Sequence, residues 1–403
     1  MGQITGDYGA GTGMAVKALR KIRAYLSLAL PQIWRRSGLG PALRARARRR
    51  SFDLEQLPEP QLLGRREEML RIRPHPIACE ASPLAEGYCQ FLSRFQDQPT
   101  PRVSAVMPLR KARLAYPSGV VAGQSASGRA GLLADAYPSP SMLDNPKYAV
   151  PQATLGLRIP RSHHAQGYLL YTCWAHNFYH WTMDILPRLG WYEDLPELRD
   201  MPLVMWDSAP GFVRASLALA APDAQVLWLP KGVHSFERLA VPTNFSNPTT
   251  LSARSVDYLR ERYLPALRRA LPDDFAASER LYVSRADAGI RRIANEPELE
   301  ARLAEHGFRK VVMSDHSLAA QAELFARAKW IVAPHGAALV NLSFCKPDAK
   351  VVEIFQEGHE SRSFYAIAGL VGLDYGFAVG RAQGADTLVD VDALLALMGR
   401  MGL

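Results

Sequence analysis

The clearest structural signal in this chain is the segment WIVAPHGAALVNLSFCKPDAKVVEIF, residues 330–355. Two apolar runs with strand character, Trp330–Ala333 and Lys350–Phe355, flank a stretch rich in Gly and Ala. The pattern predicts a strand, a tight turn, the start of a helix and a second strand. Backbone N–H groups and the positive end of that helix would then face an anion. Gly336 allows a ligand to approach the backbone closely, and His335 adds a donor beside it. A pyrophosphate suits such a site, so the first hypothesis is a nucleotide-binding enzyme.

Strands and helices alternate regularly on both sides of this segment, which predicts right-handed βαβ units and a parallel sheet. Strands are expected at 280–284, 308–313, 330–333, 350–355 and 375–379, and helices at 296–306, 317–328, 337–344, 361–371 and 390–400. Pro272-Asp273-Asp274 predicts a hinge ahead of this unit.

The chain before the hinge has a different character. From Val103 to about Leu170, short apolar runs separated by Gly, Ser and Pro predict a small antiparallel element. A first α/β unit follows, beginning with an aromatic-rich helix near 175–192. We therefore expect four parts: an N-terminal extension (1–50), an N-terminal α/β domain on the acceptor side (51–271), a C-terminal nucleotide-binding domain (272–389) and a C-terminal helix (390–403).

Length and composition fit a globular protein of about two domains, with 403 residues, 48% of them hydrophobic and 22% charged. Residues 1–50 carry eleven Lys/Arg and one acid, so they account for the whole net charge of +9 and leave the remainder at −1. This distribution argues against nucleic acid as a partner. The four scattered cysteines indicate reduced thiols. With neither a transmembrane run nor a signal-peptide pattern, a cytoplasmic location is predicted.

Residues 14–50 alternate basic and apolar residues, with apolar positions near helical spacing as far as Pro31 and a basic run at Arg44–Arg50. One interpretation is an interfacial helix attracted to anionic lipid on the inner face of the membrane, to which each basic residue contributes about 1 kcal/mol. The other is a solvated basic tail.

Candidate ligands follow the strands of the second unit, because doubly wound sheets bind ligands beyond the carboxyl ends of their strands. Those ends carry Arg285, His335-Gly336 and Glu353, and Arg291 and Arg292 follow soon after Arg285. Arginine forks suit phosphate oxygens, and Glu353 could accept ribose hydroxyls. Each residue alone has an ordinary explanation as a turn or ion-pair residue. Their convergence on one edge indicates a nucleotide-diphosphate site.

A second segment with reactive side chains is YTCWAHNFYHWTMDILPRL, residues 171–189. If it is helical, His176, His180 and Asp184 lie on one stripe at i, i+4 and i+8. They could bind zinc, although three ligands on one helix are geometrically awkward and no HExxH glutamate is present. Alternatively, His180 or Asp184 could be a general base in a cleft. The third interpretation, which the segment alone favours, is an ordinary packed helix.

Together these motifs resemble glycosyltransferase family 61 over roughly residues 100–380. LYVSR, RRIANE, LFARAKWIVAPHGAALVNLSF and VVEIF have the family's order and spacing, and HNFYHWTMDILPRL resembles its N-terminal-domain motif. The resemblance implies a GT-B-like α/β fold, with two Rossmann-like domains facing a cleft, here joined to the basic N-terminal extension and the small antiparallel β element. It also implies inverting transfer from a nucleotide-sugar, with no metal and no other cofactor.

The resemblance also implies residue roles. Arg285, Arg291, Arg292 and His335 would hold the diphosphate, and Asn295-Glu296 would brace the arginine-bearing loop or touch the nucleotide. A base from the opposite domain would deprotonate the acceptor, with Asp184 the first candidate and His180 the second. The full set of expected substrate-binding residues is His176, Arg285, Arg291, Arg292, Asn295, Glu296, His335, Gly336, Ala337, Asn341 and Glu353.

The function implied by the resemblance is that of a hexosyl- or pentosyltransferase in capsular or surface polysaccharide biosynthesis. Its expected partners are a nucleotide-sugar donor, with UDP as the nucleotide, and a glycan or lipid-linked glycan acceptor. Anionic membrane would contact residues 14–50. The alternative is a non-catalytic subunit of a polysaccharide assembly complex that binds a nucleotide-sugar or a glycan.

Overall fold

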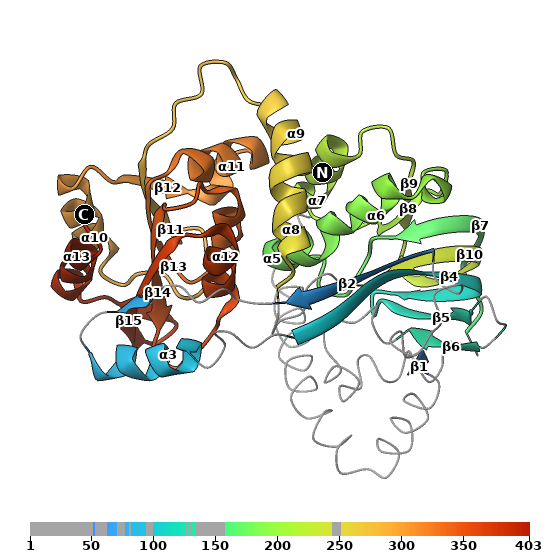
Figure 1. Ribbon diagram of the computed structural model, residues 1–403, viewed down its shortest axis with the longest axis horizontal. Helices are drawn as coiled ribbons and strands as arrows, with labels where there is room; N and C mark the ends of the chain where they lie inside the picture. The colour runs from blue at the N-terminus through green and yellow to red at the C-terminus, as the bar shows by residue number, and fades with distance from the viewer. Residues whose placement is uncertain are drawn as a thin grey trace, which may run out of the picture.

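The computed structural model describes residues 51–52, 63–70, 77–79, 82–93, 100–125, 128, 130–133, 158–243 and 251–403. They form two lobes, each built around one β-sheet, with a column of helix standing between them (Figure 1). The fold is mixed α/β, which confirms the predicted class. A GT-B-like pair of domains facing a cleft stays a prediction.

Among the described residues, the first sheet has nine strands in the order β1-β6-β5-β4-β10-β7-β8-β9, with β2 also paired to β4. Its strands are β1 (Ser51–Phe52), β2 (Gly64–Leu70), β4 (Thr100–Tyr116), β5 (Val120–Gln124), β6 (Ala130–Leu133), β7 (Ser162–Leu169), β8 (Leu203–Trp206), β9 (Val226–Leu229) and β10 (Gly232–Pro242). β4 is antiparallel to β10, whereas β10, β7, β8 and β9 run parallel. The predicted antiparallel element is therefore continuous with the parallel strands.

The aromatic-rich helix expected near 175–192 is a run of short segments: α5 (Phe178–His180), η6 (Trp181–Ile185), η7 (Leu186–Arg188) and α6 (Leu189–Asp194). Of these, η6 is a π-helix, a form frequent at functional sites. The other helices of this lobe are η8 (Pro196–Leu198) and α7 (Gly211–Ala220). The column between the lobes consists of α8 (Ala253–Tyr258), η9 (Leu259–Tyr263) and α9 (Leu264–Arg269).

The second sheet contains the predicted strand–helix alternation, in the order β12-β11-β13-β14-β15-β16. Its strands are β11 (Arg280–Ser284), β12 (Arg309–Val312), β13 (Trp330–Pro334), β14 (Lys350–Gln356), β15 (Asp374–Gln383) and β16 (Asp386–Leu388). Its helices are α10 (Glu296–Glu305), η10 (Met313–Asp315), α11 (Leu318–Arg327), η11 (Ala337–Phe344), α12 (Ser363–Val371) and α13 (Val391–Arg400). Because β11 lies between β12 and β13, the sheet has a topological switch point there, the usual ligand position in doubly wound sheets.

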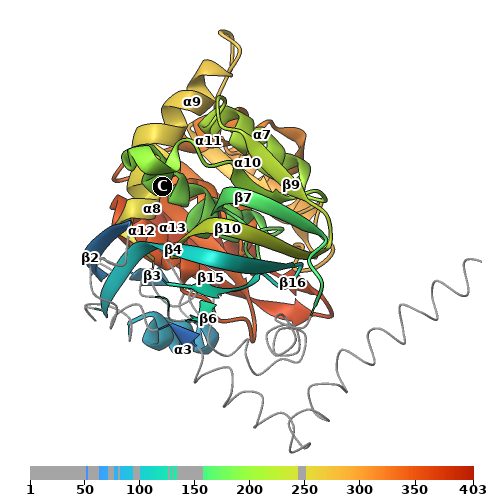
Figure 2. The ribbon, with the colours of Figure 1, turned by 90° about the vertical axis from the view of Figure 1, so that its right-hand side faces the viewer.

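One segment from before the predicted hinge joins the second sheet. β3 (Ile77–Cys79) pairs in parallel with β15, and α3 (Pro83–Ser93) lies beside them (Figure 2). The Tyr88 ring of α3 is 5.2 Å from that of Phe355 on β14. β3 and α3 are therefore structurally part of the second lobe, although the predicted hinge places them in the range 51–271.

The lobes share a continuous core that includes Trp181 of the first and Phe325 of the second. Arg260 of η9 donates to the carbonyl oxygens of Ser343 and Cys345, at 3.1 and 2.5 Å, and so caps the end of η11. The column thereby holds the strand–turn–helix segment of the second lobe in place.

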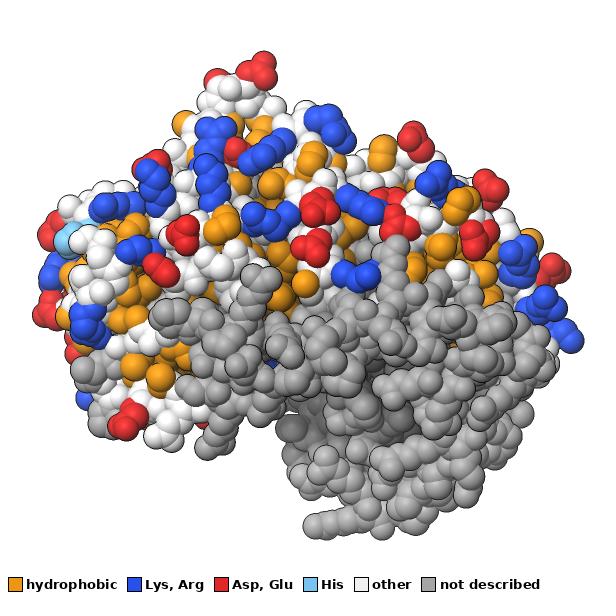
Figure 3. Space-filling model, in the orientation of Figure 1, with side chains coloured by type: hydrophobic (Ala, Val, Ile, Leu, Met, Phe, Trp, Pro, Cys, Tyr) orange, Lys and Arg blue, Asp and Glu red, His pale blue; other side chains and the backbone are white. Residues whose placement is uncertain are grey.

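Charges of both signs are interspersed on the described surface shown in Figure 3. Within the described ranges, no helix combines the length and apolar character needed to cross a bilayer. Residues 14–50, to which an interfacial helix was assigned as one interpretation, lie outside the described residues.

Candidate active site at the switch point of the second sheet

Three loops at the carboxyl ends of parallel strands converge beside the switch point. The loop after β11 carries Arg285 and Arg291, β13 leads into His335, and the loop after β14 carries His359. The rings of His335 and His359 lie 4.7 Å apart between centroids. Arg291 donates from Nη1 to Nε2 of His359 at 2.7 Å. Two arginines and two histidines thus form one cluster.

The imidazole of His335 is fixed by Glu353. Its Nδ1 bonds to Oε1 of Glu353, and the Tyr375 hydroxyl donates to Oε2 at 2.6 Å. The rings of Phe355 and Phe364 lie 5.4 and 5.0 Å from the imidazole. Glu353 is 1% exposed, so it is out of reach of a ribose. The contact suggested from the sequence is corrected accordingly: Glu353 acts on the site through His335.

Gly336 makes room for Arg285. Its φ of −179° is extended and open to any residue, but a Cβ at this position would lie 1.8 Å from Nη1 of Arg285. The guanidinium therefore lies against the turn that opens η11. The close approach to the backbone that the sequence predicted for a ligand is made here by an arginine side chain.

Arg291 has a left-handed backbone with φ 57°, a conformation that costs a non-glycine residue roughly 1–3 kcal/mol. Its N–H donates to the carbonyl of Ala385 at 2.6 Å, which anchors this conformation beside β16. Its head group is held by His359. Both ends of the residue are therefore fixed.

The two arginines of the cluster lie close enough for their charges to repel each other. Burial and the neighbouring Arg291 lower the pKa of Arg285, and Asp287 offsets part of this. Burial also lowers the pKa of Arg291. Nε of both arginines is buried without a hydrogen-bond partner among the described residues. An anion bound beside the two guanidinium groups would relieve the repulsion between their charges.

A cavity of about 680 Å³ opens beside Arg285, where the lobes meet. Ser314, Gln321 and Ala337 line it from the second lobe, and Phe212 of α7 from the first. Its volume lies in the range of small-molecule sites.

A second histidine–carboxylate pair comes from the first lobe. His180 Nδ1 and Asp184 Oδ2 are 2.7 Å apart. Asn177 begins the helical run by accepting hydrogen bonds from the N–H groups of Tyr179 and His180. The side chain of His180 is 18% exposed and that of Asp184 only 7%. The imidazole is therefore the member that can meet a substrate, and the carboxylate orients it.

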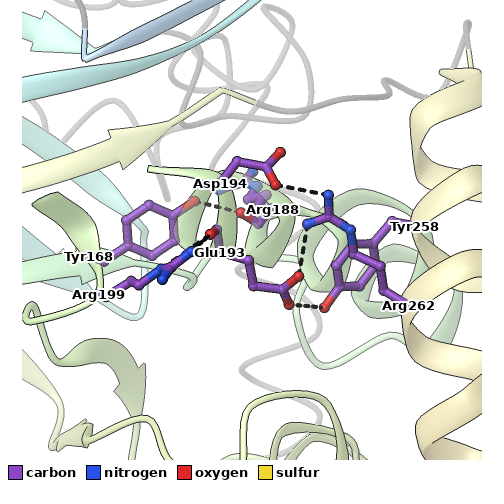
Figure 4. A network of polar contacts seen from close by, with 7 residues as sticks. All are labelled: Tyr168, Arg188, Glu193, Asp194, Arg199, Tyr258 and Arg262. Atoms are coloured by element: carbon purple, nitrogen blue, oxygen red, sulfur yellow. Dashed lines mark hydrogen bonds and ion pairs between the residues drawn. The ribbon is translucent and has the colours of Figure 1, made fainter. Parts of the chain in front are cut away.

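A polar network anchors the helical run that carries this pair (Figure 4). Arg262 of η9 donates to Glu193 and Asp194, both at 2.8 Å, and the Tyr258 hydroxyl donates to Glu193 at 3.0 Å. These contacts tie the end of α6 to the column between the lobes.

Two aromatic side chains link the histidines of the two lobes through successive ring contacts. The Tyr179 ring is 5.3 Å from that of His180 and 5.7 Å from that of Phe364, whose ring is 5.0 Å from His335. Burial raises the pKa of the Tyr179 phenol, and the nearby Asp184 raises it further. His180 and His335 thus lie on opposite sides of the boundary between the lobes, and each is bonded to a carboxylate.

The segment that carries these residues matches a known family. Residues 178–352 match the family model described as Glycosyltransferase 61. This segment is similar to glycosyltransferase family 61. The match begins at α5 and ends within β14, so it confirms the resemblance of the sequence motifs and indicates glycosyltransferase activity. No curated protein sequence matches the chain.

Two of the polar residues expected in the donor site point toward β16 instead. Arg292 is exposed and pairs with Asp386, Nη2 to Oδ2, at 2.9 Å. Asn295 donates to the carbonyl of Val389 at 2.9 Å and accepts from its N–H at 3.1 Å. These contacts stabilise the loop and do not bring the two side chains to the pair formed by Arg291 and His359.

Glu296 braces the strand end before Arg285, one of the two roles expected for it. It accepts hydrogen bonds from the hydroxyls of Tyr282 and Ser284, at 2.9 and 2.5 Å. Asn341 is 2% exposed and donates to the carbonyl of Ala338 at 3.0 Å. It therefore holds the first turns of η11.

His176 does not join the predicted stripe, because it lies exposed in the turn that precedes α5. Only His180 and Asp184 come together, one helical turn apart. In the part of the chain that the structure describes, no group of three His, Cys, Asp or Glu side chains is placed to hold a metal ion.

His359 is the one member of this cluster of two arginines and two histidines that was not predicted from the sequence. It follows β14 in the turn QEGHE, so the rule that ligands gather at strand ends could have found it. Its signal was weak because the turn lies beyond the conspicuous VVEIF motif.

Proposed function

We propose that this family 61 chain is an inverting glycosyltransferase that uses a nucleotide-sugar donor. The observation that carries the proposal is the cluster of Arg285, Arg291 and His335 at the switch point, with guanidinium donors that lack acceptors. A diphosphate has the charge and the oxygen atoms to complete this cluster. The adjacent cavity has room for a nucleoside.

In the proposed reaction the acceptor hydroxyl attacks the anomeric carbon from the face opposite the nucleotide. The new C–O bond forms as the bond between that carbon and the diphosphate oxygen breaks, which inverts the configuration. Arg285 and Arg291 stabilise the charge on the departing diphosphate. His180 takes the hydroxyl proton, and Asp184 orients the ring and stabilises the imidazolium. Sequence reasoning ranked Asp184 first, but its burial behind His180 favours the reverse order.

The proposed reaction is metal-independent, because the arginines supply the positive charge that a divalent ion supplies in other enzymes. A hexosyl or pentosyl group, UDP as the nucleotide and a role in capsular or surface polysaccharide assembly are proposed from the family resemblance. The site geometry supports a diphosphate without specifying the sugar.

The direct test incubates the purified full-length chain with a panel of nucleotide-sugars and glycan acceptors. We expect nucleotide release with one donor, no loss of activity in EDTA, and a product whose anomeric configuration, read by NMR, is opposite to that of the donor. If no donor binds by calorimetry and none is hydrolysed, the proposal fails. Binding without turnover for every acceptor would instead favour the non-catalytic subunit, and loss of activity in EDTA would refute the metal-free mechanism.

The base is tested by His180→Ala, which should lower kcat by about 10²- to 10⁴-fold while the affinity for the nucleotide stays the same. Asp184→Asn should also lower kcat, since it loses the charge that stabilises the imidazolium. His163→Ala serves as the control, because its side chain is 63% exposed on β7 of the same lobe. Wild-type turnover in His180→Ala would remove His180 from the mechanism.

A further inference from the structure

His359 contributes a hydrogen-bond acceptor to the cluster. It lies between β14 and α12, in a turn where its N–H donates to the carbonyl of Gln356 at 3.0 Å. Its Nε2 is 2.7 Å from Nη1 of Arg291. A guanidinium can only donate, so Nε2 must accept and the ring proton must be on Nδ1.

The surroundings keep this imidazole neutral. Burial, followed by the charges of His335, Arg291 and Arg285, lowers the pKa of His359 to about 4. Near neutral pH its Nε2 lone pair is therefore available to Arg291.

We propose that His359 is a positioning residue that holds the guanidinium of Arg291 beside His335 to receive the donor diphosphate. This inference rests on the proposed function. The side chain of Arg291 has several rotatable bonds, and the contact with His359 fixes its far end in advance of binding, which reduces the ordering cost at binding.

The charge of the group that accepts the hydrogen bond from Arg291 affects how well Arg291 can bind an anion. Arg292, the next residue, is paired with the carboxylate of Asp386, which balances its charge. Arg291 is held by a neutral ring instead, so its orientation is fixed while its full charge stays available to an anion. A carboxylate at position 359 would also accept a hydrogen bond from Arg291, but its negative charge would compete with the diphosphate.

The test measures binding of UDP and of inorganic pyrophosphate to the full-length chain by calorimetry at pH 7.5, together with KM and kcat for the active donor. His359→Ala should weaken pyrophosphate binding about tenfold and raise the donor KM more than it lowers kcat. The affinity of His359→Gln, whose amide oxygen can replace Nε2, should stay within about threefold of that of the wild type.

His359→Asp should bind pyrophosphate more weakly than His359→Ala. His306→Ala, an exposed histidine at the end of α10, is the control, and thermal melting checks the fold of each variant.

Four results would overturn the inference. Equal losses in the Ala and Gln variants would mean that the ring acts by packing. Wild-type binding in His359→Ala, while Arg291→Ala weakens it, would remove His359 and leave the proposed function standing. Tight binding in His359→Asp would refute the requirement for a neutral acceptor. If Arg285→Ala and Arg291→Ala both bind pyrophosphate like wild type, the proposed site itself fails. If His359→Ala does not fold, pyrophosphate binding by His359→Gln and by His359→Asp is compared instead, and equal binding by these two variants would overturn the inference.

Discussion

A Cβ on residue 336 would lie 1.8 Å from Nη1 of Arg285, although the two residues come from different loops. Because Nη1 is the far end of a flexible side chain, it can move aside at little cost in stability. It would then no longer lie at the opening of η11, where we propose that the diphosphate binds. Gly336 therefore preserves the position of a charge rather than an unusual backbone.

Gly336→Ala should consequently weaken binding of UDP by about tenfold or more while the melting temperature stays within a few degrees of wild type. The matched control is Gly289→Ala in the arginine-bearing loop, where an added Cβ meets nothing within 4 Å. Calorimetry and thermal melting measure the two effects separately. Unchanged affinity in Gly336→Ala would show that the Arg285 guanidinium does not contact the nucleotide.

The lowered pKa of His359, about 4 in the folded chain, also predicts a pH dependence of stability. An unfolded histidine titrates near 6.5, so between about pH 4 and 6.5 the unfolded state binds more protons. Stability should rise with pH across this window and fall as the pH drops through it. After a discount for the partial exposure of His359, this effect should lower the free energy of unfolding at pH 5 by roughly 1–2 kcal/mol relative to neutral pH. Between pH 7 and pH 5, the melting temperature of His359→Gln should fall less than that of the wild type. Equal decreases in the two proteins would contradict the lowered pKa of His359.

At the scale of helices and strands, the second lobe could be predicted from the sequence because the spacing of apolar residues differs between its helices and its strands. The range predicted for β11 agrees with the structure, and those for β13 and β14 differ by one residue at their ends. The pairing of β3 with β15 could not be predicted, since it joins segments far apart in the chain and a three-residue strand carries little pattern. The π segment η6 was also hidden, because its residues fit an ordinary helix.

The candidate site shows the same division. Arg285 and His335 could be predicted as candidates because each follows the carboxyl end of a strand with a clear apolar pattern. The sequence could not separate Arg291 from Arg292, because only the left-handed φ at Arg291 and the carboxylate of Asp386 send the two side chains to different partners. Nor could it show Glu353 buried behind His335, because that depends on register between β13 and β14 and on Tyr375 of the next strand.

The packing of α9 against α11 allows a prediction at this scale. Glu323 of α11 is 5% exposed and accepts from Arg268 of α9 at 2.8 Å and from Arg327 at 2.7 Å. Burial raises the pKa of Glu323, but the two arginines outweigh this and lower it. Its contribution to stability is therefore present above about pH 4.5 and is lost as the pH falls through the folded pKa.

Glu323→Gln should lower the free energy of unfolding by about 1–3 kcal/mol at pH 7, since it leaves two arginines with a weaker acceptor. Glu279→Gln is the control, because Glu279 pairs with Lys329 at a site where both side chains are more than 60% exposed and the pair is worth little. Thermal melting compares them. Equal shifts in the two variants would show that burial adds nothing to the Glu323 pairs.

At the scale of the whole molecule, the proposed chemistry needs both lobes. The proposed proton acceptor and the proposed diphosphate site come from different lobes, and the column formed by α8, η9 and α9 lies between these lobes. Arg262 ties that column to α6, and Arg260 ties it to η11. The column is therefore a structural connection between the two halves of the proposed site.

The distribution of charge over the chain leads to a prediction about location. Residues 1–50 contribute +10 while the remainder is nearly neutral, so attraction to an anionic surface should depend on the N-terminal segment. We expect the full chain to float with vesicles that contain anionic lipid and not with neutral ones. Replacing the five arginines of residues 44–50 with glutamine should weaken this binding more than tenfold, since each basic residue near the surface contributes about 1 kcal/mol. Donor affinity should stay unchanged, because the proposed site lies in the second lobe. Equal flotation of the variant and the wild type would mean that the basic run is a solvated tail.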